Sequence, residues 1–195
     1  MTLLVDVLEE HGLDSIDVVL FALPGVGDVG KNAVELLNEA NEARTVARFI
    51  HPGLTPLARL DEDGLLAPPH LAACRIDTEN GPSILTITGR GQPSESFQQH
   101  DFTTELLKHL SEAGMKELIV LAGLMSTPEI KEAFAVATTS SHRVHLEEHG
   151  VDVRRDQPSG GAIGMSALMA SLAPLFGLKS VCAMATTVGA SGDVH

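Results

Sequence analysis

The sequence predicts an α/β protein: a three-layer α/β/α sandwich with a mixed, mostly parallel sheet. Apolar runs of strand length alternate along the chain with segments of helical periodicity. That alternation is typical of a largely parallel sheet whose connecting helices cover both faces. Two strand-like runs separated only by the turn at residues 79–82 indicate a hairpin, and hence at least one antiparallel strand.

The first half of the chain begins with a buried strand at residues 18–22, followed by apolar residues at helical spacing from Val29 to Ala40. The stretch 51–70 is rich in proline and acidic residues, and we expect it to be a loop with little regular structure. The remaining strands of this half are predicted at residues 46–50, 71–76 and 84–88, the last two forming the hairpin.

The second half contains an amphipathic helix from Phe102 to Ala113, with Asp101 or Thr103 as its N-terminal cap and Gly114 at its end. The stretch from Gln157 to Leu178 carries no charge, but prolines and glycines interrupt it, so we interpret it as a buried helix rather than a membrane span. Two strands precede this helix, which covers residues 161–176, and a third follows it: 118–122, 134–138 and 180–186.

Composition limits the partners and the environment of the protein. With 195 residues, of which 44% are hydrophobic, the chain is predicted to form a single domain over residues 1–195. Acidic residues outnumber basic ones 26 to 13, and the net charge of −13 would repel nucleic acid and anionic membranes. Cys74 and Cys182 lie in apolar surroundings and are expected to be free buried thiols in a reducing cytoplasm.

A glycine-rich turn follows the first buried strand. Gly25, Gly27 and Gly30 spell GxGxxG between a strand and a helix, the setting in which this motif binds dinucleotides. Such binding also requires an acidic residue at the end of the second strand, and His51 and Pro52 occupy that place. The turn is therefore interpreted as a tight structural corner, or as a site for a small anion, and Asp28 as the N-cap of the following helix.

Several short motifs occur in a fixed order: residues 23–30 (LPGVGDVG), 51–52 (HP), 85–93 (LTITGRGQP), 121–124 (LAGL), 158–164 (PSGGAIG) and 183–188 (AMATTV). Their order and spacing resemble the PAC2 (proteasome assembly chaperone 2-like) family. The resemblance implies a phosphorylase/hydrolase-like sandwich and a cytoplasmic protein that forms homo-oligomers. It also implies a role as an assembly chaperone or adaptor for 20S proteasomes. Family members that dock on the proteasome end in a hydrophobic–Tyr–any-residue tail, whereas this chain has no Tyr and ends in Asp193-Val194-His195.

One group of residues forms our candidate ligand site. Ligands of open α/β sheets bind at the carboxyl ends of parallel strands, and several glycines and two basic residues follow such strands. The predicted ligand-binding residues are Gly25, Gly27, Asp28, Gly30, His51, Gly89, Arg90 and Gly161. The alternative is that these glycines serve only the geometry of turns.

Metal binding and nucleophilic catalysis have little support in the sequence. His142, His145 and His149 share one helical stripe, but no Cys or Asp cluster accompanies them, so we interpret the stripe as a solvated face and predict no metal. The chain has no GxSxG motif, and we predict no catalytic residues and no cofactor.

The sequence therefore favours a PAC2-like cytoplasmic protein, not an enzyme, that acts through contacts with copies of itself and with proteasome subunits. The alternative is a protein or enzyme that binds a small molecule, a phosphate or a nucleotide, with the Gly25–Gly30 turn.

Overall fold

A single eight-stranded mixed sheet organises the structure, a computed structural model that describes residues 2–61, 63–79 and 81–189. The strand order is β1-β3-β6-β7-β2-β8-β10-β9. The four strands β7, β2, β8 and β10 run parallel in the middle, and each of the other pairs is antiparallel. The strands are β1 (Leu4–Val7), β2 (Ile16–Phe21), β3 (Arg44–Ile50), β6 (Leu71–Ile76), β7 (Ser83–Gly89), β8 (Glu117–Met125), β9 (Ala133–Ala137) and β10 (Lys179–Thr187).

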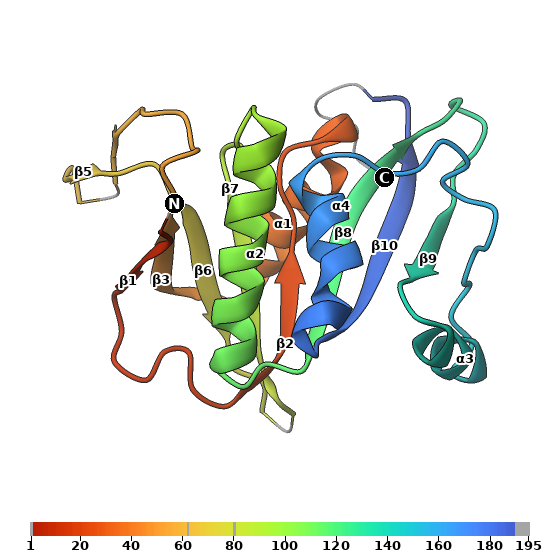
Figure 1. Ribbon diagram of the computed structural model, residues 1–195, viewed down its shortest axis with the longest axis horizontal. Coiled ribbons are helices and arrows are strands. Elements are labelled where there is room, and N and C mark those ends of the chain that lie inside the picture. Colours follow the sequence, from red (N-terminus) through yellow and green to blue (C-terminus); the bar gives the residue numbers. More distant parts are fainter. Residues whose placement is uncertain (1, 62, 80, 190–195) are drawn as a thin grey trace.

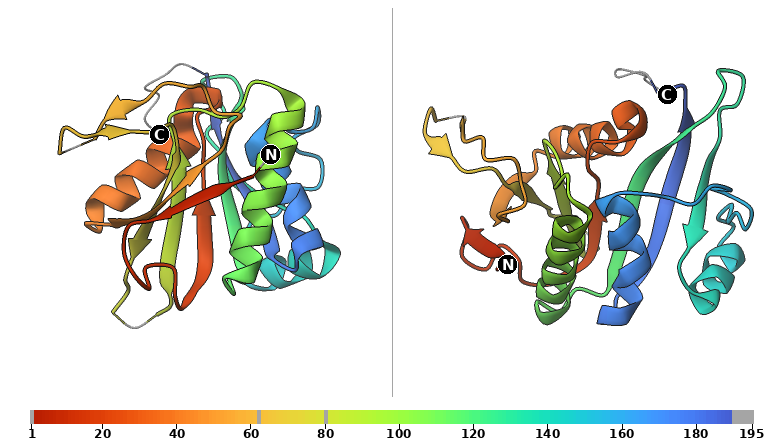
Figure 2. Two further views of the ribbon diagram at one scale, coloured as in Figure 1. Left: turned by 60° about the vertical axis from the view of Figure 1, so that its left-hand side comes forward. Right: turned by 45° about the horizontal axis from the view of Figure 1, so that its top comes forward.

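Helices cover both faces of this sheet, as predicted (Figures 1 and 2). Helix α1 (Val29–Ala40) packs on β7 and β8 from one side. Helices α2 (Ser96–Glu112) and α4 (Met165–Leu172) pack on each other and on the opposite side, and a short 3₁₀ helix, Ala173–Phe176, continues α4. Helix α3 (Ser140–Glu148) lies beside β9 at one end of the sheet. The predicted three-layer α/β/α architecture is therefore confirmed.

An aliphatic core fills the space between the sheet and α2. Leu106, Leu107 and Leu110 of α2 are fully buried, and they belong to one cluster with Leu85 and Ile87 of β7. Leu85 and Ile87 are two residues apart on β7 and so share one face of the strand, and the three leucines share one face of α2, which places these side chains on facing surfaces. Continuous apolar runs in the central strands and apolar residues at helical spacing are why these strands and helices could be assigned from the sequence.

Helix α2 begins earlier than the sequence suggested. Glu95 occupies the N-cap position with extended backbone, so Asp101 and Thr103 lie inside the helix and the predicted caps are wrong. The reason is that the first turn, from Ser96, is largely polar and adds no apolar periodicity. Gly114 ends the helix as predicted, with φ of 87° and its N–H donating to the Ser111 carbonyl.

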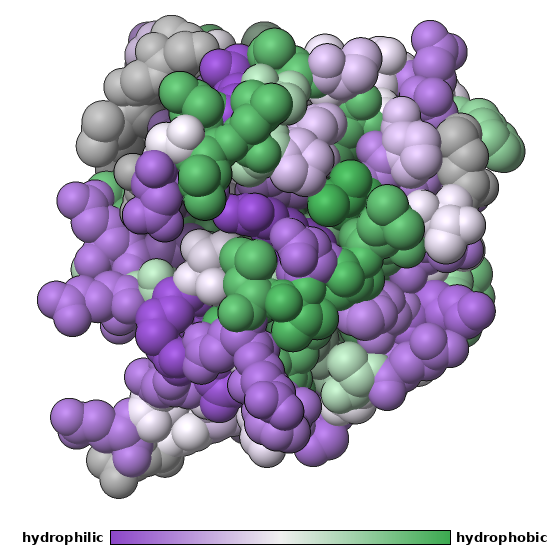
Figure 3. Space-filling model, turned by 90° about the vertical axis from the view of Figure 1, so that its left-hand side faces the viewer, coloured by the Kyte–Doolittle hydropathy of each residue, from purple (hydrophilic) through white to green (hydrophobic). Residues whose placement is uncertain are grey.

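Two elements at one flank of the molecule were not predicted. Strand β1 pairs with β3 at the edge of the sheet, and a two-stranded hairpin of β4 (Arg59–Leu60) and β5 (Leu66–Ala67) interrupts the expected loop. We call the segments 54–61 and 63–70, which carry this hairpin, the arm. The arm projects from the body of the molecule (Figure 2), and Figure 3 shows that apolar and hydrophilic side chains alternate in clusters on this flank.

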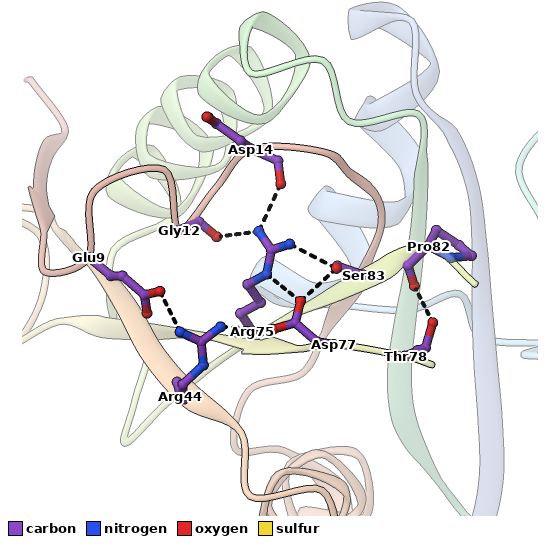
Figure 4. A network of polar contacts seen from close by, with 9 residues as sticks. All are labelled: Glu9, Gly12, Asp14, Arg44, Arg75, Asp77, Thr78, Pro82 and Ser83. Atoms are coloured by element: carbon purple, nitrogen blue, oxygen red, sulfur yellow. Dashed lines mark hydrogen bonds and ion pairs between the residues drawn. The ribbon is translucent and has the colours of Figure 1, made fainter. Parts of the chain in front are cut away.

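A network around Arg75 closes the sheet at the edge opposite the carboxyl ends of the parallel strands (Figure 4). The Arg75 guanidinium donates to the carbonyls of Gly12 and Asp14, to Ser83 Oγ at 2.9 Å and to Asp77 Oδ1 at 2.6 Å. Hydrogen bonds from Arg75, Ser83 and Arg44 lower the pKa of Asp77 to about 2. The network thereby ties the segment before β2 to the β6–β7 hairpin.

Two further expectations concern the C-terminal part of the chain. In the part of the chain that the structure describes, every helix is too short or too polar to cross a bilayer, and the Gln157–Leu178 stretch contains a loop, α4 and the short 3₁₀ helix. The expectation about the C-terminal Asp193-Val194-His195 lies outside the described residues.

Candidate functional site

Most of the predicted ligand residues follow strands whose carboxyl ends share one edge of the sheet. The glycine turn follows β2, and Arg90 follows β7. His51 follows β3, which runs in the same direction as β7 because two antiparallel pairings separate them. The sequence argument that brought these loops to one edge is therefore supported, and the contacts of each residue show what it does there.

The glycine turn is packed against the sheet. A Cβ on Gly30 would lie 2.2 Å from the carbonyl oxygen of Leu121 in β8, and one on Gly27 would lie 2.6 Å from Thr187 Oγ1. From the other side, a Cβ on Gly123 would lie 2.1 Å from the carbonyl oxygen of Val26. These glycines let the start of α1 approach β8 and β10 closely, which is the geometry expected of a structural corner.

Asp28 differs from its predicted role in one respect. It occupies the N-cap position of α1, as expected, but in a left-handed conformation with φ of 53° and without a side-chain bond to the helix. Its carboxylate instead accepts a hydrogen bond of 3.2 Å from the Gly25 N–H. The side chain therefore fixes the turn before the helix, while the helix backbone begins without it.

His51 is buried at the end of β3. Its ring stacks on Phe102 of α2 with centroids 4.6 Å apart, and its Nδ1 accepts a hydrogen bond of 3.0 Å from the Gly53 N–H. Nε2 lies 3.2 Å from Asp101 Oδ2, and because Nδ1 accepts, Nε2 carries the proton that it donates to this carboxylate. These contacts give His51 a role in joining β3 to α2.

Gly89 and Arg90 line a pocket that we call the arm cleft. It has a volume of about 920 Å³ and lies between the arm, the start of the 89–92 loop and the uncovered part of the sheet beside α1. Thr45, Arg48, Ala72 and Thr88 contribute its floor. Arg48, Ala72 and Thr88 are cross-strand neighbours, and a shift in register after Thr45 turns that side chain to the same face.

Asp61 fixes the arm above this floor. Its carboxylate accepts hydrogen bonds from the backbone N–H groups of Asp63 and Leu65, which shape the tip of the hairpin. The same carboxylate lies 3.4 Å from the Arg48 guanidinium on the floor, and Arg48 also lies 3.7 Å from Asp6 of β1. One arginine thus joins the arm, β3 and β1.

The arm residues were missed in the sequence because a proline-rich, acidic stretch is typical of a loop. One signal could have identified them: the stretch contains five leucines, which a solvated loop does not need. These are Leu54, Leu57, Leu60, Leu65 and Leu66.

Gly161 lines a different pocket, of about 560 Å³, between α4, the start of α2, β9 and β10. The structure therefore does not bring Gly161 into the cleft with Arg90. Cys182 lines this second pocket, and burial raises the pKa of its thiol to about 11. Burial also raises the pKa of Cys74. Both cysteines are free and buried, as predicted, and their thiols stay protonated at neutral pH.

His142 and His145 lie in α3 and His149 occupies its C-cap position, and each of the three has protein contacts. The predicted solvated face is wrong for His142, which is buried, with Nδ1 3.0 Å from the Ser180 carbonyl and Nε2 3.4 Å from Glu117. The His149 Nδ1 donates to the His145 carbonyl at 2.8 Å. Within residues 2–61, 63–79 and 81–189, no three His, Cys, Asp or Glu side chains converge as ligands of a metal ion.

Comparison with solved structures places this architecture among known folds. A protein from Pyrococcus furiosus described as PbaB, an archaeal proteasome activator, aligns with a TM-score of 0.83 and 22% identity over 98% of this chain and 83% of that chain. PbaA from the same organism, described as an archaeal homolog of proteasome-assembly chaperone, aligns with a TM-score of 0.75 and 21% identity over 95% and 77% of the two chains. At these identities the likeness shows a shared fold.

A proteasome-assembly chaperone homologue from Mycobacterium tuberculosis shows the same fold, with a TM-score of 0.67 and 18% identity over 87% of this chain and 75% of that chain. No curated protein gives a significant match to the sequence. The family model of the PAC2 family matches residues 19–193, nearly the whole chain. The chain therefore belongs to the PAC2 family.

Proposed function

We propose that this protein is an assembly chaperone or adaptor that acts through protein–protein contacts, and that its partners are subunits of the 20S proteasome. Membership of the PAC2 family supports the proposal. So do the described roles of structural neighbours, which include an archaeal proteasome activator and two homologues of proteasome-assembly chaperones.

The observation that carries the proposal is the apolar flank formed by β1 and the arm. Leu4 of β1 is 59% exposed, and Leu60 and Leu66 of the arm are 70% and 72% exposed. Apolar side chains contribute about 25 cal/mol of stabilisation for each Å² that they remove from water, so a partner that covers them gains that energy. Clusters of exposed apolar side chains mark interaction surfaces rather than solvated ones.

We also propose that the chain acts as a single domain, in the cytoplasm and as a homo-oligomer. The continuous sheet supports a single folding unit, because β2 from the first half of the chain pairs directly with β8 from the second half and so joins the strands of both halves in one sheet. In a homo-oligomer, a second copy of the chain would cover exposed apolar side chains outside the arm, such as Leu175.

Binding of a phosphate or nucleotide by the Gly25–Gly30 turn is the alternative function. The contacts of this turn favour the structural role, since the space beside Gly30 is filled by the backbone of β8 and the space beside Gly27 by Thr187.

The proposal is tested by purifying the tagged protein from the cytosol of its own organism, with mass spectrometry and mass photometry on the eluate. We expect 20S proteasome subunits in the eluate, and less of them with Leu60→Ser/Leu66→Ser. Leu36→Ser is the matched control, because Leu36 is 61% exposed but lies on α1. Recovery of the protein alone as a closed homo-oligomer would contradict the proposal.

A further inference from the structure

We infer that the arm cleft binds an acidic segment of a partner protein, with leucine-type side chains against the arm and carboxylates on Arg59 and Arg90. The inference rests on the proposed function and specifies the chemistry of the partner. It is based on three features of the cleft: the charged side chains that are paired within the protein, the two arginines that are not, and the apolar side chains that line it.

Three of the charged side chains that line the cleft, Glu35, Arg48 and Asp61, are paired within the protein. Arg48 on the floor is paired with Asp61 and Asp6. Glu35, on the α1 wall, lies 2.6 Å from Lys31. Among the described residues, the remaining carboxylate of the lining is that of Asp63, at the tip of the hairpin.

Two guanidinium groups of the cleft have no such partner. Arg59 and Arg90 are exposed and line the cleft from opposite walls, the arm and the loop after β7. Neither forms an ion pair within 4.0 Å with a carboxylate of residues 2–61, 63–79 or 81–189. In a chain with a net charge of −13, two unpaired arginines in one concave site favour a negatively charged group there.

The size and lining of the cleft favour a polypeptide over a free anion. A volume of about 920 Å³ is far larger than an inorganic anion needs. Leu8, Leu57 and Leu60 line it as well, and all three are exposed. An occupant that covers these leucines and reaches both arginines must carry apolar and acidic groups along an extended chain.

The test uses a fluorescein-labelled octapeptide of alternating glutamate and leucine, and its counterpart with glutamine in place of glutamate. Fluorescence anisotropy with the wild-type protein should give about tenfold tighter binding of the acidic peptide, and the preference should weaken as salt is raised. The variant Arg59→Gln/Arg90→Gln should lose that preference. Arg155→Gln is the matched control. Arg155 is also exposed, but it follows α3, pairs with Glu147 of that helix and lies outside the cleft.

Equal binding of the two peptides, no binding of the acidic peptide, or an acidic preference that survives in Arg59→Gln/Arg90→Gln would overturn the inference. Mass photometry of the same variants, without peptide, covers another occupant: a changed oligomeric state would assign the cleft to a second copy of this chain and also overturn it. Because no proteasome is present, the test is separate from the proposed function. If the peptide test fails while proteasome subunits are still captured, the proposed function holds and the assignment of the cleft is wrong. If the peptide binds as expected while no proteasome subunits are captured, the assignment of the cleft holds and the proposed function is wrong.

Discussion

Asp77 shows how a single exposed carboxylate can hold distant parts of this chain together. It accepts hydrogen bonds from Arg75 and Ser83, while Arg75 also donates to the carbonyls of Gly12 and Asp14. The ionised carboxylate is what these donors favour, and the pKa of Asp77 accordingly falls from 3.8 to about 2. Its contribution to stability is therefore present above its ordinary pKa and is lost as the pH falls through about 2.

Replacing Asp77 with Asn should lower the melting temperature at pH 6, because the amide keeps the shape but removes the charge that Arg75 and Arg44 face. The difference from the wild type should shrink as the pH is lowered from about 4 towards 2, in thermal unfolding followed by circular dichroism. Asp63→Asn, on the arm, is the control. A difference between wild type and Asp77→Asn that stays constant down to pH 2 would contradict the assigned pKa.

At the scale of elements, the glycine turn decides how closely α1 approaches the sheet. Gly30 lies within the first turn of α1, where alanine would ordinarily favour the helix. We expect Gly30→Ala to destabilise the protein instead, by about 1–3 kcal/mol, because the added Cβ would lie 2.2 Å from the backbone oxygen of Leu121.

Thermal unfolding of Gly30→Ala measures this effect, and Gly160→Ala is the matched control. A Cβ on Gly160 meets no atom within 4 Å and its φ is not in the left-handed region, so that variant should unfold like the wild type. A Gly30→Ala protein as stable as the wild type would mean that α1 can move away from β8, and that the turn is free to serve another purpose.

The sequence was sufficient to predict the elements in which an apolar pattern extends over several residues. Helix α1 repeats apolar residues at helical spacing, and the β6–β7 hairpin and the central strands contain largely apolar runs of five or more residues. Strand β1, of four residues, and strands β4 and β5, of two each, are too short for a period, and contacts such as Arg48 with Asp61 fix them. The candidate site could be predicted only in part. The sequence placed Arg90 at the sheet edge where the structure has it, whereas the positions of Arg59 and Asp61 depend on how the arm folds back, which the sequence pattern did not indicate.

At the scale of the whole molecule, the two flanks of the sheet are closed differently. Beyond β9, the segment around Val153 forms a bridge with Ala135 and covers that edge. At the other end, β1 is the last strand in the order (Figure 1), its Leu4 and Val7 are exposed, and Arg48 links it to the arm through Asp6 and Asp61. An uncovered edge strand is available for pairing with another chain. We therefore propose that partners bind at the flank formed by β1 and the arm.

Hydrogen exchange of the protein, alone and mixed with purified 20S proteasome α subunits of the same organism, tests this account most directly. We predict slower exchange of β1 and of the arm segments 54–61 and 63–70 in the mixture, with little change in α3. The protection should be lost in Leu60→Ser/Leu66→Ser and kept in Leu36→Ser. Exchange that is the same with and without the subunits, or protection confined to α3, would contradict it.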